Sequence, residues 1–254
     1  MKIALTREIS PNFNQCELTH LDRQPIDLAL ARQQHHEYED ALSAVGCIVC
    51  RLPAEAGLPD SVFVEDCALV VDEAAVITRP GADSRRAEVE AIARVLAPYR
   101  KLYFVQPPGV VDGGDILRVE RRIWIGLSTR SNQPACDQMR DFLGPYGYEV
   151  NTARLAGCLH LKSAVTQVAP DALLLNPAWV DPAALPGFDI IEVHPAEPSA
   201  ANAVLVGETI IYPKAYPRTL ERLQARGIQT VLVDASEVAK AEGAVTCCSL
   251  LLNI

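Results

Sequence analysis

The sequence lacks any long apolar run. No stretch of its 254 residues approaches the roughly 18 continuous apolar residues that a membrane span needs. The opening residues, MKIALTREIS, hold only a short apolar run before Thr6 and Arg7 and no cleavage-site pattern, which does not fit a secretory signal. We therefore expect a cytoplasmic protein whose thiols stay reduced.

Positive charge is also scarce. The formal net charge is -9, and like-charge blocks, low-complexity runs and metal-binding tracts are absent. Nucleic acid and anionic membrane both require a basic face, so neither is expected as a partner. An acidic protein is compatible with a small cationic ligand.

The eight cysteines form no recognisable metal or disulfide framework. Cys47-Ile-Val-Cys50 has redox-motif spacing, but it lies in a β-branched run, and residues three apart on a strand face opposite sides. There is no second CxxC to complete a zinc site, and His35-His36 has no thiol at ligand spacing. We interpret the CxxC cysteines as small structural residues.

The apolar pattern predicts a repeated order of strand, strand, helix and strand. In four units the predicted strands are 68–71, 74–80 and 102–105; 115–119, 123–128 and 148–150; 163–168, 172–177 and 188–193; and 202–206, 209–213 and 230–234. Helices are predicted over 84–96, 134–143 and 218–226, and the third unit has only a weak, turn-rich helical stretch. A fifth unit forms only if the chain ends combine: strand 247–254, strand 2–6, helix 28–46 and strand 47–52.

Five such units, spaced by about 40 to 50 residues, are typical of a closed ring of blades. We predict a single α/β domain over residues 1–254, with ββαβ-type repeats around a pseudo-fivefold axis and a ring closed by strands from both termini. The competing interpretation is a doubly wound dinucleotide fold. Its Gly-rich turn is missing, because PGVVDGGD (108–115) precedes a strand and lacks GxGxxG.

Polar residues recur just before the first strand of each unit. They are Glu65 and Asp66, Asp112 and Asp115, His160 and Lys162, Asn202, and Thr246 with Cys247. In a ring these positions converge on one axial face. Each residue alone could be a strand-end cap or a salt-bridge partner, but together they predict a functional cluster, because polar groups buried without partners are costly.

The residue types of this cluster predict covalent catalysis. A thiolate can attack an electrophilic carbon while a histidine moves protons. Acidic groups around the thiol would repel the oxyanion of an amide hydrolase. They suit a guanidinium or amidinium, which binds carboxylates through paired N–H groups.

Several segments resemble the dimethylarginine dimethylaminohydrolase family of the pentein, or guanidine-modifying, superfamily of five-bladed α/β propellers. They are LPDSVFVEDCAL (58–69), TRPGADSRRAE (78–88), VVDGGDI (110–116), LHLKSA (159–164) and the terminal VTCCSLL. FVED followed by TRPGxxSRR is specific to this family, whereas the GGD and HLK pieces recur across the superfamily. The resemblance runs from about residue 16 to the C-terminus and implies hydrolysis of Nω-methylated L-arginine to L-citrulline through a covalent S-alkylthiouronium intermediate.

The resemblance also implies residue roles. Cys247 would be the nucleophile, His160 the proton donor and then the base, and Asp66 and Asp112 the guanidinium ligands with Glu65 nearby. The amino-acid end of the substrate would be held by Asp60, Arg85 and Arg130 and by backbone groups of Leu18 and Ala241. Cys248 would be structural. Ala241-Glu242 departs from the bulkier residue and Asp of close relatives, which bears on fine specificity.

Structural interpretations stand beside these roles. Arg85 and Arg86 could lie on the solvated face of a helix start, Asp60 could cap a turn, and Arg130 could support a helix start. The expected partner is a small cationic amino-acid substrate, and a homodimer is compatible with the resemblance. No metal or organic cofactor is expected, because the substrate cation can itself stabilise the thiolate. The alternatives are an arginine deiminase or other guanidine hydrolase of the superfamily, and a non-catalytic binding protein with the same fold.

Overall fold

A computed structural model describes residues 1–254, and its strands form five separate three-stranded sheets. Four sheets contain β3 (Ala68–Val70), β4 (Ala74–Ile77) and β5 (Lys101–Phe104); β6 (Ile116–Val119), β7 (Arg122–Leu127) and β8 (Glu149–Arg154); β9 (Val165–Ala169), β10 (Ala172–Leu175) and β11 (Asp189–Glu192); and β12 (Val204–Val206), β13 (Thr209–Pro213) and β14 (Gln229–Val233). In each sheet the middle strand pairs antiparallel with the first strand and parallel with the third. The predicted strands are confirmed, with shifts at their ends.

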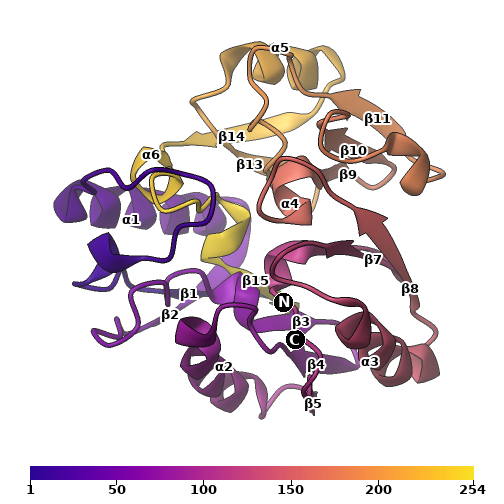
Figure 1. The fold of residues 1–254 in the computed structure, drawn as a ribbon. Helices are drawn as coiled ribbons and strands as arrows, with labels where there is room; N and C mark the ends of the chain where they lie inside the picture. Colours follow the sequence, from indigo (N-terminus) through magenta and orange to yellow (C-terminus); the bar gives the residue numbers. More distant parts are fainter.

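Helices connect the second and third strands of the units, because parallel strands need a crossover. They are α1 (Leu28–Ala44), α2 (Val89–Leu96), α3 (Gln133–Leu143) and α5 (Pro217–Ala225), and Figure 1 shows them at the outside of the molecule. The third unit has only the 3-10 helix η6 (Pro182–Ala184) there, as its weak pattern predicted. The prediction of one helix over 84–96 is wrong in its first part. Residues Asp83–Glu88 form the 3-10 helix η3, whose Arg85 turns inward to a buried carboxylate.

The fifth sheet is built from both ends of the chain. It contains β15 (Leu250–Asn253), β1 (Lys2–Arg7) and β2 (Cys47–Leu52), in that order. β15 and β1 pair antiparallel, and the Met1 amino group donates to the Ile254 carbonyl oxygen at 2.7 Å. The two termini therefore lie side by side (Figure 1). This confirms the predicted closure by strands from both termini.

The hydrophobic core is divided into five clusters, and each joins two neighbouring sheets. Adjacent residues of one strand serve different clusters: Leu69 packs toward β6 and β7, whereas Val70 packs toward β15. This follows from the alternation of side chains along a strand. The remaining clusters join β6 to β10, β9 to β13, and β12 back to β1 and α1. The apolar contacts thus run in an unbroken circle, which excludes the doubly wound alternative.

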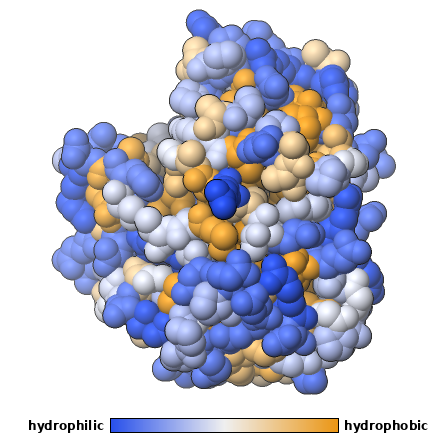
Figure 2. Space-filling model, turned by 45° about the vertical axis from the view of Figure 1, so that its right-hand side comes forward, coloured by the Kyte–Doolittle hydropathy of each residue, from blue (hydrophilic) through white to orange (hydrophobic).

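The two cysteines of the CxxC segment face opposite sides of their strand, as the alternation of side chains along a strand predicts. Cys47 is buried and Cys50 is exposed, so their thiols face opposite sides of β2, and all eight cysteines are unpaired. None of the helices has the length and apolarity that crossing a membrane requires. On the face drawn in Figure 2, hydrophilic residues cover most of the surface and the hydrophobic ones form separate patches.

Shortening one side chain of the terminal strand β15 tests whether this strand stabilises the ring. Leu252 on β15 is 5% exposed and packs with Ala68 and Val70 of the next blade, so Leu252→Ala should lower the free energy of unfolding by about 2–5 kcal/mol. Ile48 on β2 of the same sheet is 50% exposed, and Ile48→Ala should cost only about 0.5 kcal/mol. Urea unfolding measures both values. Equal losses would contradict the closed ring.

Candidate active site

Short helical turns precede four of the five first strands. They are η2 (Val64–Cys67), η4 (Gly113–Asp115), α4 (Leu161–Ala164) and η7 (Thr246–Cys248), and they contact one another at the ring axis. A helical turn spreads side chains in several directions, unlike a strand, which alternates between two faces. One turn can therefore point one residue at a cavity and its neighbour away from it. The predicted convergence of the strand starts is confirmed.

His160 and Asp112 form the centre of the site. His160 Nε2 lies 3.1 Å from Asp112 Oδ2, and the other oxygen of Asp112 accepts the Gly81 N–H at 2.8 Å. Both side chains are buried. Burial opposes the charged imidazole, but Asp66, Asp112 and Asp115 outweigh it and raise the pKa of His160 to about 9. His160 is therefore protonated at neutral pH and can donate a proton.

Asp66 is the second carboxylate of the site. Its Oδ2 accepts from Arg85 Nη1 at 2.6 Å, and its Oδ1 accepts the Gly114 N–H at 2.9 Å. Burial opposes its ionisation, yet Arg85 and His160 lower the pKa of Asp66 to about 2. Gly114 is required here, because a Cβ at this position would lie 2.5 Å from the His160 ring. Asp66 is thus a fixed negative charge beside His160.

The two adjacent cysteines face different cavities. Cys247 lines a cavity with His160, Asp66 and Arg85, whereas Cys248 lines a separate one on the side of α1. Both lie in the turn η7 and not in the strand, which begins at Leu250. Burial, followed by the charges of Glu65 and Asp66, raises the pKa of Cys247 to about 12. The thiol therefore holds its proton at neutral pH.

A loop from the N-terminal part of the chain closes this cavity. The Glu17 N–H donates to Asp60, and the N–H groups of Thr19, His20 and Leu21 all donate to the carboxylate of Glu242. Glu242 has a φ of 57°, a left-handed conformation that is uncommon outside glycine. Arg130 adds a bond to the Thr19 hydroxyl at 2.8 Å. These contacts fix residues 17–21, here called the closing loop, beside the cavity, which Glu17 helps to line.

Most of the predicted site residues surround one cavity. Those that line it are Asp60, Asp66, Arg85, Arg130, His160, Ala241 and Cys247, and Asp112 lies behind His160. Leu18 does not line it, and packs with the hydrophobic cluster beside α1. Arg85 is only 5% exposed and also pairs with Glu88 at 2.8 Å, so it does not lie on a solvated helix face.

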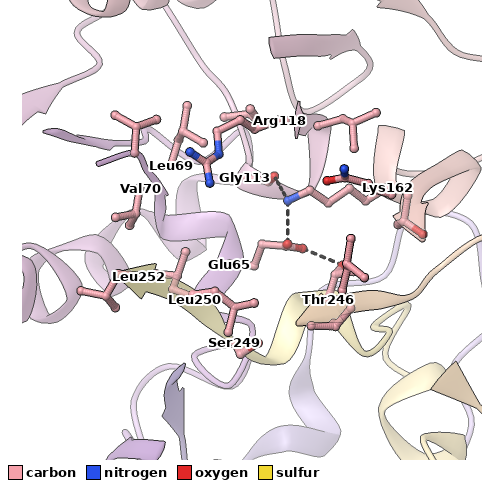
Figure 3. Close-up of a pocket in the computed structure, with 18 of the residues that line it drawn as sticks. Glu65, Leu69, Val70, Gly113, Arg118, Lys162, Thr246, Ser249, Leu250 and Leu252 are labelled. Atoms are coloured by element: carbon pink, nitrogen blue, oxygen red, sulfur yellow. Dashed lines mark hydrogen bonds and ion pairs between the residues drawn. The ribbon is translucent and has the colours of Figure 1, made fainter. Parts of the chain in front are cut away.

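Glu65 points away from this cavity. Its carboxylate accepts from Lys162 Nζ at 2.6 Å and from the Thr246 hydroxyl at 2.8 Å (Figure 3). These three residues line a second, larger cavity of about 370 Å³ at the other end of the axis. The structure therefore places Glu65 between the two cavities, with both carboxylate oxygens already occupied.

Two residues of the site have no role in the sequence-based assignment. Asp115 is fully buried and accepts from Ser128, Ser131 and the Leu161 N–H, so it fixes the turn that follows His160. In the sequence, its place in the GGD motif is the feature that could have indicated a role in the site. Glu242, which holds the closing loop, was noted only as a departure from relatives, since nothing local indicates a partner more than 200 residues away.

One set of residues has the geometry to hold a metal ion. The ligand atoms of Asp66, Asp112 and His160 lie within 4.8 Å of one another. Each is already engaged, however: Asp66 with Arg85, and Asp112 with His160. The carboxylates that a metal ion would need are therefore already paired with Arg85 and His160.

Comparison with known proteins identifies close relatives, although no protein-family model matches the chain. The chain is 38% identical over 226 residues to N(G),N(G)-dimethylarginine dimethylaminohydrolase of Pseudomonas aeruginosa, covering 88% of this chain and 89% of that protein. It is 38% identical over 258 residues to the protein of the same name from Streptomyces coelicolor, covering 99% and 97%.

Solved structures agree with these relatives. A Cys-to-Ser variant of the Pseudomonas aeruginosa enzyme complexed with citrulline superimposes with a TM-score of 0.92, at 35% identity and with 98% of each chain covered. A His-to-Gly variant of dimethylarginine dimethylaminohydrolase bound as an adduct with S-methyl-L-thiocitrulline gives 0.93 at 35% identity, covering 99% and 100%. The N-terminal domain of a cyanobacterial arginine dihydrolase, at 21% identity and 0.85, shares the fold.

The charge arrangement predicts how His160 titrates. Burial lowers the pKa of His160, and the charge of Asp66 is the largest single electrostatic effect that raises it, so Asp66→Asn should lower this pKa from about 9, whereas Asp60→Asn should not. Between pH 6.5 and 9 the folded protein keeps a proton that the unfolded chain has lost. This contribution to stability is complete below pH 6.5 and disappears as pH rises through 9.

NMR titration of labelled histidine gives the pKa of His160 in both variants. An unchanged pKa in Asp66→Asn, or an equal fall in Asp60→Asn, would contradict this assignment of the charges.

Proposed function

Because the chain belongs to the dimethylarginine dimethylaminohydrolase family, we propose that it hydrolyses Nω-methylated L-arginines to L-citrulline, releasing dimethylamine or methylamine. The protein is accordingly a hydrolase that acts on a C–N bond. One observation carries the proposal: a buried thiol, a protonated histidine and two carboxylates surround one small cavity. The citrulline complex and the S-methyl-L-thiocitrulline adduct of the relatives support the same substrate class.

The substrate guanidinium is proposed to lie beside Asp66 and Asp112. An oxygen of each carboxylate lies within 4.8 Å of a His160 ring nitrogen, and Asp66 lines the cavity together with Cys247. Paired N–H to carboxylate bonds orient a planar cation. Glu65 has both oxygens engaged by Lys162 and Thr246, which supports an indirect role. The positive charge of the substrate guanidinium would offset the negative charge of the carboxylates around the pocket.

The amino-acid end is proposed to lie near the closing loop. Asp60 would accept the ammonium group, and Arg130 would bind the carboxylate, since its main partner is the Thr19 hydroxyl. Arg85 is held by Asp66 and Glu88, so it would act on the carboxylate at longer range. Backbone groups of Ala241 would complete the pocket, whereas Leu18, which does not line the cavity, would not contact the substrate directly.

The reaction runs in two halves. The Cys247 thiolate adds to the guanidinium carbon, and the bond from that carbon to the methylated nitrogen breaks as His160 gives this nitrogen its proton. The amine leaves, and the carbon remains bound to sulfur as an S-alkylthiouronium. The neutral His160 then takes a proton from water, and the hydroxide adds to the carbon. As the C–S bond breaks, the hydroxyl proton passes to the departing sulfur, which yields citrulline and replaces the proton that the thiol released to solvent when substrate bound.

The cationic substrate would also activate the thiol. Glu65 and Asp66 help to keep the pKa of Cys247 at about 12 in the free protein. A guanidinium beside the sulfur opposes that effect, because a positive charge favours the thiolate. Activation would thus occur only when substrate is bound. No metal or organic cofactor takes part in this scheme.

A citrulline assay with cysteine variants tests the proposal. The wild-type protein should form citrulline from monomethylarginine and asymmetric dimethylarginine. Cys247→Ser should abolish turnover, because a hydroxyl is a far weaker nucleophile, whereas Cys248→Ser should retain it. Loss of the imidazole in His160→Ala should cost at least about 100-fold in kcat.

Arginine and agmatine serve as comparison substrates, and the ureido product measured for agmatine is N-carbamoylputrescine, because agmatine lacks the carboxylate of citrulline. Citrulline from arginine alone would favour a deiminase, and no ureido product from any of the four would favour a binding protein. Full activity in Cys247→Ser would overturn the assignment of the nucleophile.

A further inference from the structure

A hydrogen-bonded ring crosses the axis directly behind the site. It takes one residue from each of the five units: Glu65, Gly113, Lys162, Asn202 and Thr246. Lys162 Nζ donates to Glu65 and, at 3.2 Å, to the Gly113 carbonyl oxygen (Figure 3). Thr246 donates to the other oxygen of Glu65. Asn202 completes the ring.

The Asn202 side chain forms hydrogen bonds to two neighbouring turns. Its Oδ1 accepts the Thr246 N–H at 3.1 Å, and its Nδ2 donates to the Thr246 hydroxyl at 3.0 Å. The same Nδ2 donates to the Lys162 carbonyl oxygen at 3.0 Å. The side chain is buried, with only 4% exposed. The two bonds to Thr246 are therefore shielded from competing water, and the bond to Lys162 is partly shielded.

These two turns carry the reacting groups. Thr246 directly precedes Cys247, and Lys162 follows His160 by two residues in the adjoining turn α4. Asn202 itself does not line the substrate cavity. It can thus affect the thiol and the imidazole only through the backbone to which each is attached.

We propose that Asn202 is a positioning residue that fixes the Cys247 turn relative to the His160 turn. This inference rests on the proposed function, in which thiol and imidazole act on one substrate carbon. The carbon must lie in contact with the sulfur while its leaving nitrogen faces the imidazole. A displacement of about 1 Å in such geometry can cost about 100-fold in rate.

Removing the Asn202 amide takes a partner from the Thr246 N–H and from the Lys162 carbonyl. The Thr246 hydroxyl also loses one bond and keeps the one that it donates to Glu65. Buried groups that lose a partner favour local rearrangement. The turn η7 would shift toward new partners and carry Cys247 with it. Contacts to the substrate from Asp60 and Arg130 would stay in place. The expected signature is a fall in kcat with little change in KM.

The matched control is Asn176. It is also 4% exposed, and its side chain makes two hydrogen bonds, to the Pro198 carbonyl oxygen at 2.8 Å and the Ala178 N–H at 3.0 Å. It lies at the end of β10, outside the ring behind the site. Asn176→Ala thus removes a similarly buried amide and should reduce thermal stability without a selective loss of kcat.

The experiment compares kcat, KM and thermal unfolding of Asn202→Ala, Asn202→Asp and Asn176→Ala. We expect kcat to fall by about 10- to 100-fold in both Asn202 variants, with KM near that of the wild type. Asn202→Asp matters because it keeps the side-chain shape and one acceptor but loses both donations. Wild-type kcat in the Asn202 variants, or an equal fall in Asn176→Ala, would overturn the proposal.

Variants of Thr246 test the same proposal if Asn202→Ala does not fold. Thr246→Ser keeps the hydroxyl and should retain most of the kcat, whereas Thr246→Val should lose about 10-fold or more. Equal kcat in the two Thr246 variants would overturn the proposal. Absence of citrulline from the wild-type protein is a separate result, which would refute the proposed function itself.

Discussion

Four carboxylates, those of Glu65, Asp66, Asp112 and Asp115, are buried at the centre of the ring, and the organisation of the site depends on how they are paired. A buried carboxylate is costly unless donors surround it. Each has its own: a lysine for Glu65, an arginine for Asp66, His160 for Asp112, and two hydroxyls and a backbone N–H for Asp115. Asp66, Asp112 and Asp115 also keep His160 protonated, and burial together with Glu65 and Asp66 keeps the Cys247 thiol neutral, so the paired carboxylates also influence the protonation of both groups.

The ring topology brings these groups together. Each unit enters its first strand at the axis, and in four of the five units a short helical turn there can point one side chain at the cavity and its neighbour elsewhere. Asp66 and Cys247 face the cavity, whereas Glu65 and Thr246 face the network behind it. No single sheet could supply this set, because neighbouring residues of a strand have only two directions. The site is therefore a property of the closed ring.

Much of this was predictable from the sequence, because it depends on local pattern. Strand and helix order, the joining of the two termini, and the convergence of the strand starts all follow from apolar periodicity, and the structure confirms them. The α-helix predicted from residue 84 begins instead at Val89, because a buried ion pair draws Arg85 inward. The direction of Glu65 and the pairing of Glu242 with the closing loop depend on contacts between distant segments, which no local pattern encodes.

The central claim is that the axial cluster delivers the Cys247 thiol, and not its neighbour, to a guanidinium carbon. Acid quenching during turnover of asymmetric dimethylarginine, followed by mass spectrometry of the C-terminal peptide, tests this directly. The account predicts a covalent adduct on Cys247 whose mass equals the substrate cation minus dimethylamine. An adduct on Cys248, or turnover to citrulline by a direct route that never forms an adduct, would contradict it.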